Sequence, residues 1–168
     1  MAYELIVATF PGDMEKASEQ LERYHASQDD IGIADAAAII KPVEGKDKVE
    51  WLGGNKKAAE IGAVSGAVLG ILGGPPAMMV MGLAGAATGK LISNLSHAGI
   101  SKKLINAIED GLEPGSSAVI VIIEHGNRQL ILKDLKGLGA NIVSEAVESH
   151  EIEGKYMISP VSGSGETQ

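Results

Sequence analysis

Hydrophobic and polar positions along the chain fall into patterns that predict strands, amphipathic helices and one long uncharged stretch. Runs rich in Leu, Ile and Val predict strands, and they occupy 3–10, 34–43, 118–123 and 141–147. Shorter apolar runs over 48–52 and 155–161 can add two more strands. Apolar residues three or four positions apart predict helices. These helices begin at the cap residues Asp13, Ser101 and Asn127 and run to 26, 110 and 137–139.

The stretch between Glu60 and Lys90 contains no charged residue. Its glycines recur three or four positions apart, a spacing that aligns them on one helix face, and they are Gly62, Gly66, Gly70, Gly82, Gly85 and Gly89. Two glycines followed by two prolines predict a turn in the middle, at Gly73, Gly74, Pro75 and Pro76. The pattern therefore predicts a hairpin of two glycine-zipper helices.

Glycine destabilises the interior of a helix. Each costs roughly 1 kcal/mol relative to alanine, so six would cost on the order of 6 kcal/mol. Close packing between helices can offset this cost, because small residues let two backbones approach each other. The other side chains of the stretch are large and apolar, and two arms cannot shield all of them from water. We therefore expect the hairpin to pack in a homo-oligomer, in lipid, or against its own domain.

The order of the predicted elements indicates an α+β fold. Strand, helix and strand precede the hairpin and a further helix, and strand, helix and strand then follow. This split βαβ order is typical of a ferredoxin-like domain, with a four-stranded antiparallel sheet and two helices on one face. The domain is expected to comprise residues 1–55 and 113–150. The hairpin and its following helix form an insertion over 56–112, and 151–168 form a C-terminal extension and tail.

Composition excludes several classes of function. The 168 residues are 45% hydrophobic and 21% charged, which is typical of a folded domain. Aromatic residues make up 3% and the net charge is −8, so nucleic acid is not an expected partner. The absence of cysteine excludes disulfides and thiolate sites. The first ten residues lack a basic leader and contain Glu4, so they are not expected to act as a signal peptide, and a cytoplasmic location is expected.

No residue set in the sequence specifies a reaction, a metal or a cofactor. The most site-like cluster is Glu124-His125-Gly126-Asn127-Arg128, but a polar loop with Asn127 as helix cap is favoured. The acidic run 148–153 can bind a cation, and a solvated segment is favoured there. Residues 53–57 lack the spacing of a phosphate-binding loop, so a linker is favoured. We therefore expect a protein that is not an enzyme.

Three segments together resemble a known family. They are ELIVATF at the start, IGAVSGAVLGILGGPPAMMVMGLAGAATG in the middle and AVIVIIEHGNRQLILKDLKGLGANIV near the end. A ferredoxin-like chain with such an inserted hairpin is similar to a bacterial family of uncharacterised predicted membrane proteins. The resemblance covers most of the chain. It implies no activity and no catalytic residues.

Three functions follow as hypotheses, in descending order. In the first, hairpins from several subunits pack together, so the partner is the protein itself. In the second, the hairpin enters one leaflet of a membrane, with Lys56, Lys57 and Lys90 near the headgroups. An arm of about 14 residues spans roughly 21 Å, whereas a spanning helix needs about 20 residues. In the third, a small molecule binds at the turns near Asp13 and His125.

Overall fold

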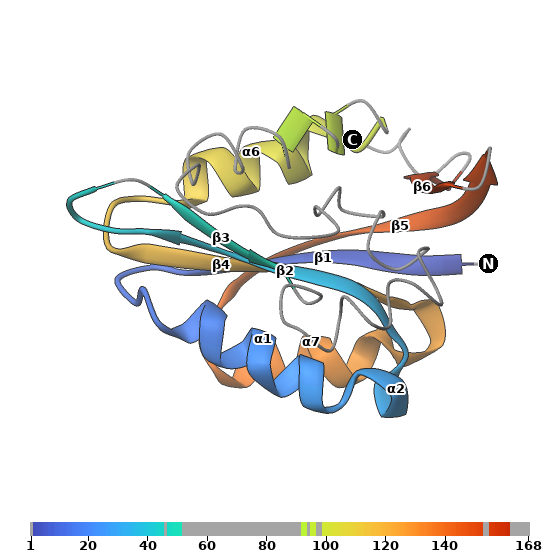
Figure 1. Ribbon diagram of the computed structural model, residues 1–168, viewed down its shortest axis with the longest axis horizontal. Coiled ribbons are helices and arrows are strands. Elements are labelled where there is room, and N and C mark those ends of the chain that lie inside the picture. Colours follow the sequence, from blue (N-terminus) through green and yellow to red (C-terminus); the bar gives the residue numbers. More distant parts are fainter. Residues whose placement is uncertain are drawn as a thin grey trace.

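The computed structural model describes residues 2–45, 47–51, 92–93, 95–96, 99–152 and 155–161. Six strands form one antiparallel sheet in the order β3-β2-β4-β1-β5-β6 (Figure 1). Their bounds are β1 Ala2–Phe10, β2 Ile33–Lys41, β3 Lys48–Trp51, β4 Ser116–Glu124, β5 Asn141–Ile152 and β6 Lys155–Pro160. The α+β class expected from the sequence is confirmed.

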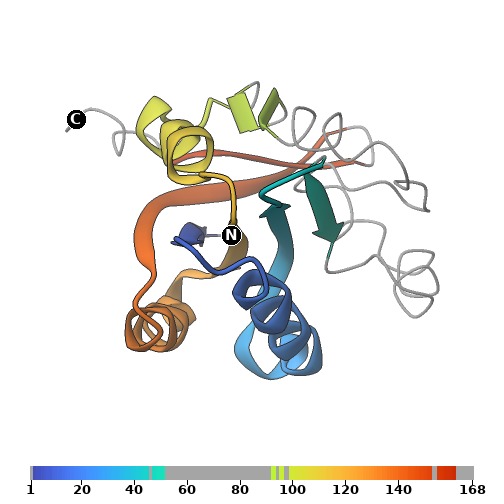
Figure 2. The same ribbon diagram turned by 90° about the vertical axis from the view of Figure 1, so that its left-hand side faces the viewer.

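Helices cover both faces of this sheet. Their bounds are α1 Lys16–Ala26, α2 Gln28–Ile31, α6 Lys102–Gly111 and α7 Arg128–Gly137, and the short 3-10 helix η1 spans His125–Asn127. Figures 1 and 2 show α1 and α7 side by side beneath the sheet and α6 above it. Two of the helices therefore share one face, as expected, while the helix that follows the inserted stretch packs on the opposite face.

The expected count of four strands is wrong, because both of the shorter apolar runs join the sheet. β3 returns from β2 as a hairpin and forms one edge. β6 returns from β5 in the same way and forms the other edge. Each added strand follows its neighbour within a few residues of chain, so the addition costs little loop entropy. Four central strands are thereby extended to six.

The sheet separates two hydrophobic clusters, because successive side chains of a strand point to opposite faces. Above it, Leu5 and Val7 belong to the cluster that contains Leu104 of α6. Below it, Ile6 and Ala8 belong to the cluster with α1 and α7. Strand β4 is buried on both faces, which explains its continuous apolar run.

Two helix starts differ in detail from the expected caps. The carboxylate of Asp13 accepts hydrogen bonds from the backbone N–H of Glu15 and of Lys16, each at 3.0 Å, so it caps the turn that precedes α1. Helix α1 itself begins two residues later than expected, with Glu15 in place of Asp13 at its N-cap. Asn127 occupies the N-cap position of α7, but its side-chain amide donates to the carbonyl of Ile31 at 3.1 Å instead. Ser101 caps α6 as expected, accepting from the N–H of Leu104.

Tyr24 lies in the lower cluster and is 3% exposed. Burial raises the pKa of its hydroxyl, and Asp134 raises it further while Arg23 lowers it. The neutral hydroxyl is therefore favoured in the folded state. The raised pKa makes the folded state more stable by an amount that is fully present below the unfolded pKa of about 10. This part of the free energy of unfolding is lost as the pH rises above that value.

Replacing Tyr24 with Phe is expected to remove this alkaline loss. Urea unfolding at pH 8 to 11 is the measurement, and above pH 10 the free energy of unfolding should fall less in Tyr24→Phe than in the parent protein. Parallel curves for the two proteins across this range would contradict the prediction.

Candidate functional site

The residues that the sequence singles out for assembly lie outside the part of the chain that the structure describes. They are the zipper glycines Gly62, Gly66, Gly70, Gly82, Gly85 and Gly89, and the turn residues Gly73, Gly74, Pro75 and Pro76. Lys56, Lys57 and Lys90 lie outside it as well, as does the whole stretch 53–57. What the structure does describe is how the folded domain holds the two flanks of this segment.

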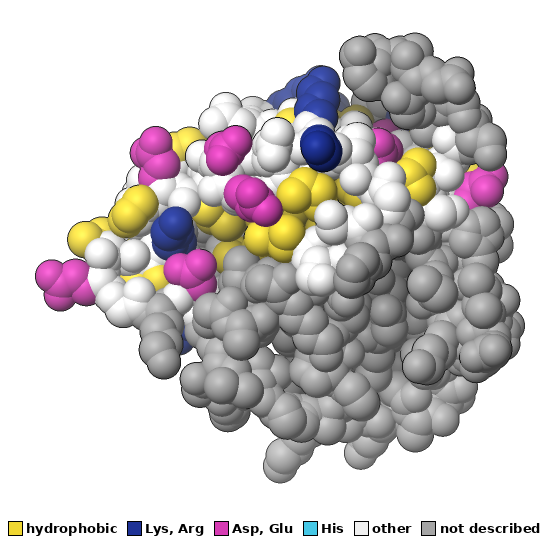
Figure 3. All heavy atoms as spheres, turned by 90° about the horizontal axis from the view of Figure 1, so that it is seen from above, with side chains coloured by type: hydrophobic (Ala, Val, Ile, Leu, Met, Phe, Trp, Pro, Cys, Tyr) yellow, Lys and Arg dark blue, Asp and Glu magenta, His cyan; other side chains and the backbone are white. Residues whose placement is uncertain are grey.

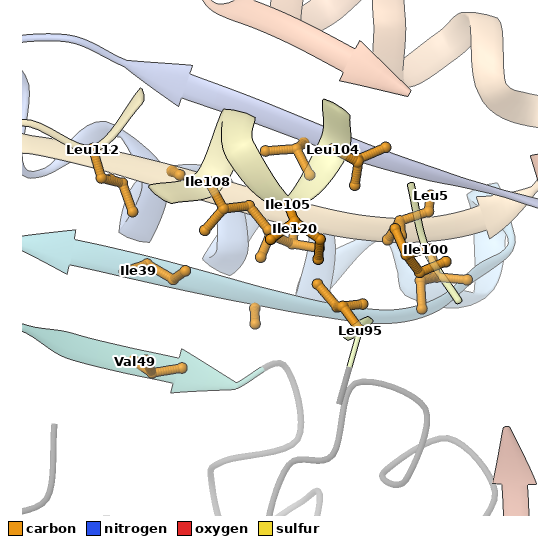
Figure 4. Packing of buried hydrophobic residues seen from close by; sticks show 14 of the residues in the cluster. Leu5, Ile39, Val49, Leu95, Ile100, Leu104, Ile105, Ile108, Leu112 and Ile120 are labelled. Atoms are coloured by element: carbon orange, nitrogen blue, oxygen red, sulfur yellow. The ribbon is translucent and has the colours of Figure 1, made fainter. Parts of the chain in front are cut away.

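Both flanks pack in one hydrophobic cluster on the upper face of the sheet. Val49 of β3 precedes the segment, while Leu95 and Ile100 follow it, and all three are buried there. Figure 4 shows them beside Ile39 and Ile120, from the strands beneath. Burying one such aliphatic side chain contributes about 1.5–3 kcal/mol. The domain therefore holds the two flanks on the same side of the sheet.

The backbone after the segment is tightly held. Gly99 has φ +85°, its N–H donates to the carbonyl of Ser96, and the N–H of Ile100 donates to the carbonyl of Leu95. This pair of hydrogen bonds is a Schellman motif, which ends a helix with a left-handed residue.

Strands β5 and β6 hold the same turn from the other side. The N–H of Ser101 donates to a carboxylate oxygen of Glu145 at 3.2 Å. A side chain at Gly99 would lie 3.6 Å from the ring of Pro160. Figure 3 looks down on this face, where hydrophobic side chains gather between acidic and basic ones. The flank therefore lies against two strands of the sheet, β5 and β6.

The cluster around His125 lies elsewhere, at the turn between β4 and α7. His125 Nδ1 is 3.5 Å from a carboxylate oxygen of Glu4, which is 6% exposed. Arg128 Nη1 lies 2.8 Å from His125 Nε2 and 3.3 Å from His125 Nδ1. A guanidinium can only donate, so the ring nitrogen that bonds to Arg128 is the acceptor.

Glu4 was not recognised from the sequence as a partner of this cluster. Its Oε2 is buried and has no hydrogen-bond partner among the described atoms. The available signal was one acidic residue inside an otherwise apolar strand. The contact between Glu4 and His125 attaches the turn to β1, in keeping with the polar loop that the sequence favours.

The two turns proposed for a small molecule are far apart. Asp13 follows the end of β1 at Phe10, and Phe10 pairs with Ser117 at the start of β4. His125 follows Glu124, which pairs with Tyr3 at the other end of β1. Seven residues of strand separate the two ends, or roughly 23 Å at 3.3 Å per residue. Asp13 and His125 therefore cannot contribute to one small-molecule site.

Gly32, which directly precedes β2, lies against the turn between β4 and α7. Its φ is +71°, and a Cβ there would lie 2.8 Å from Glu124 Oε2 and 3.0 Å from Asn127 Nδ2. Gly12 has a similar φ of +73° with nothing within 4 Å of a Cβ. A substitution at Gly12 therefore introduces backbone strain alone, whereas the same substitution at Gly32 introduces strain and crowding.

Gly32→Ala is expected to lower the free energy of unfolding by about 2–3 kcal/mol. Two costs add up: the alanine is strained in the left-handed backbone conformation, and its Cβ displaces Asn127 and breaks the hydrogen bond to Ile31. Gly12→Ala is the matched control and should cost about 1–2 kcal/mol, from strain alone. Urea unfolding of both variants measures the difference. Equal losses would show that crowding at Gly32 relaxes without cost.

The described residues contain no group of three or more His, Asp or Glu side chains placed to hold a metal ion. In the acidic run, the residues up to Ile152 belong to β5, and Glu153 lies outside the described part. None of the helices described here is long and apolar enough to cross a membrane.

Comparison with known proteins identifies a family for this chain, but it finds no individual protein that matches. No curated protein and no solved structure matches the chain. Residues 59–154, more than half of the chain, match a family model described as a protein of unknown function, DUF1269. The match spans the whole uncharged stretch 61–89 together with α6, β4, α7 and β5. The chain therefore belongs to DUF1269, a protein family of unknown function.

Proposed function

We propose that this protein is a self-assembling, non-enzymatic protein in which a glycine-zipper hairpin over 61–89 packs against hairpins of other copies. The observation that carries the proposal is that one cluster, on one face of the sheet, buries both flanks of the segment. Segment ends held on one rigid face can present a hairpin in a fixed direction. Repeated copies could then meet through the same small-residue surface.

The rest of the fold is consistent with a carrier domain of this kind. The central strands run in the order β2-β4-β1-β5, all antiparallel, with α1 and α7 on one face. This order supports a ferredoxin-like core into which the hairpin is inserted between β3 and α6. The flank after the segment is anchored through Leu95, Gly99 and Ser101, which is what an interaction element needs at its base.

Light scattering of the purified protein, prepared without detergent, tests this function. A discrete soluble particle many times the 17.3 kDa of one chain is the expected result. A monomer under these conditions would overturn the proposal, because the hairpin would then pack on its own domain.

The competing function is a membrane anchor at the cytoplasmic face. Its support is the absence of charge between Glu60 and Lys90 and the three lysines that flank this stretch. It predicts recovery of the protein only with detergent or lipid. The same preparation therefore decides between the two functions.

A further inference from the structure

A groove lies between α1 and the β2–β3 hairpin, on the lower face of the sheet. Its volume is about 460 Å³, and it is open to solvent. Helix α1 packs against β2 and β4, whereas β3 at the edge extends past it. Side chains of β3 therefore form one wall of the groove and α1 forms the other. The hydroxyl of Ser18 donates to the carboxylate of Glu50 and links the two walls.

The floor of the groove is apolar. Met14, Ile40 and Pro42 line it, and Met14 is 38% exposed. Val43, which follows Pro42 directly, is 70% exposed. These two are among three large hydrophobic side chains that the described part of the chain leaves exposed, the third being Leu130. An exposed apolar side chain that lines a groove, as Met14 does, marks an interaction site more often than an isolated one does.

The walls are acidic. Glu15, Glu19 and Glu22 occupy one side of α1 at spacings of four and three residues, and Glu50 faces them from β3. Like charges at such spacing destabilise a helix slightly, whereas the position of Glu15 and Glu19 at the N-terminal end of α1 favours negative charge. Lys16 pairs with Glu19 at 3.3 Å, and Lys48 is the basic residue of the lining.

We propose that this groove binds a cationic amphipathic peptide segment of a partner protein. One apolar side chain of the segment rests on Met14, Ile40 and Pro42, and its Lys or Arg side chains meet the acidic row. The row from Glu15 to Glu22 extends over about 10 Å of helix, which matches about three residues of extended peptide. An apolar floor with a charged rim is the usual anatomy of such a contact.

Fluorescence anisotropy with the full chain and a labelled ten-residue peptide of Lys with two central Leu residues tests the proposal. Binding is expected, and the double variant Glu19→Gln/Glu22→Gln should weaken it roughly tenfold. The matched control is Glu109→Gln/Asp110→Asn, which removes the same charge from exposed positions of α6 on the opposite face. The control should bind as the parent does.

Two outcomes would overturn the proposal. One is an equal loss of affinity in the control, because the net charge of the protein alone would then explain binding. The other is equal binding of a ten-residue peptide of Lys alone, because the apolar floor would then play no part. Met14→Ser addresses the floor from the protein side and should weaken binding of the Lys-Leu peptide several-fold. Circular dichroism confirms that each variant is folded.

Discussion

Gly66→Leu is expected to abolish assembly and leave a particle of one chain, 17.3 kDa. Gly66 is the middle residue of the row Gly62, Gly66 and Gly70, where two helix backbones are expected to be closest. A leucine side chain there holds the backbones apart, so the packing that offsets the helical cost of the glycines is lost. Light scattering of the variant and the parent at equal concentration measures the change.

Gly137→Leu is the matched control for this substitution. Gly137 ends α7, is exposed and would have nothing within 4 Å of a Cβ. The same chemical change is made there in open space, so the oligomer mass should not change. If Gly66→Leu assembles like the control, the zipper is not the assembly surface.

Leu95→Ala is expected to lower the free energy of unfolding by about 2–5 kcal/mol. Leu95 is 1% exposed and packs in the upper cluster, where it holds the flank that follows the hairpin. Deletion of its side chain leaves a cavity and loosens this attachment. A fall in oligomer mass should accompany the loss of stability, at temperatures where the domain is still folded.

Leu135→Ala separates the two effects. Leu135 is fully buried in the lower cluster, on α7, so a similar loss of stability is expected. It does not touch the cluster that holds the hairpin flanks, and assembly should persist. Thermal unfolding together with light scattering compares the variants. If both assemble like the parent, the anchoring cluster does not direct the hairpin.

Elements with strong local signals were predictable from the sequence. The run Ala118–Ile123 lies inside β4, because β-branched residues in a continuous apolar run belong in a strand covered on both faces. Ser101 caps α6 because its hydroxyl can reach an N–H three residues ahead without help from the rest of the fold. Each of these features is decided within a few residues of chain.

Features that depend on distant residues were not predictable. Asn127 has the right type and place for a cap, yet its side chain bonds to Ile31, which α2 brings beside it. Glu4 meets His125 only because β1 and β4 are neighbours. The acid-rimmed groove arises from the overhang of β3 past α1, which no local pattern records. Such contacts are set by the tertiary structure.

The central pairing of β1 with β4 also governs when the chain can fold. Every paired residue in it joins positions more than a hundred residues apart, from Phe10 and Ser117 to Tyr3 and Glu124. During synthesis, β1 must therefore wait until the ribosome has produced residue 124. The uncharged stretch 61–89 emerges during that interval, before the sheet beneath its flanks exists. Until residue 124 is made, the apolar segments of the nascent chain lack their partners in the sheet, and exposed apolar segments are prone to aggregate.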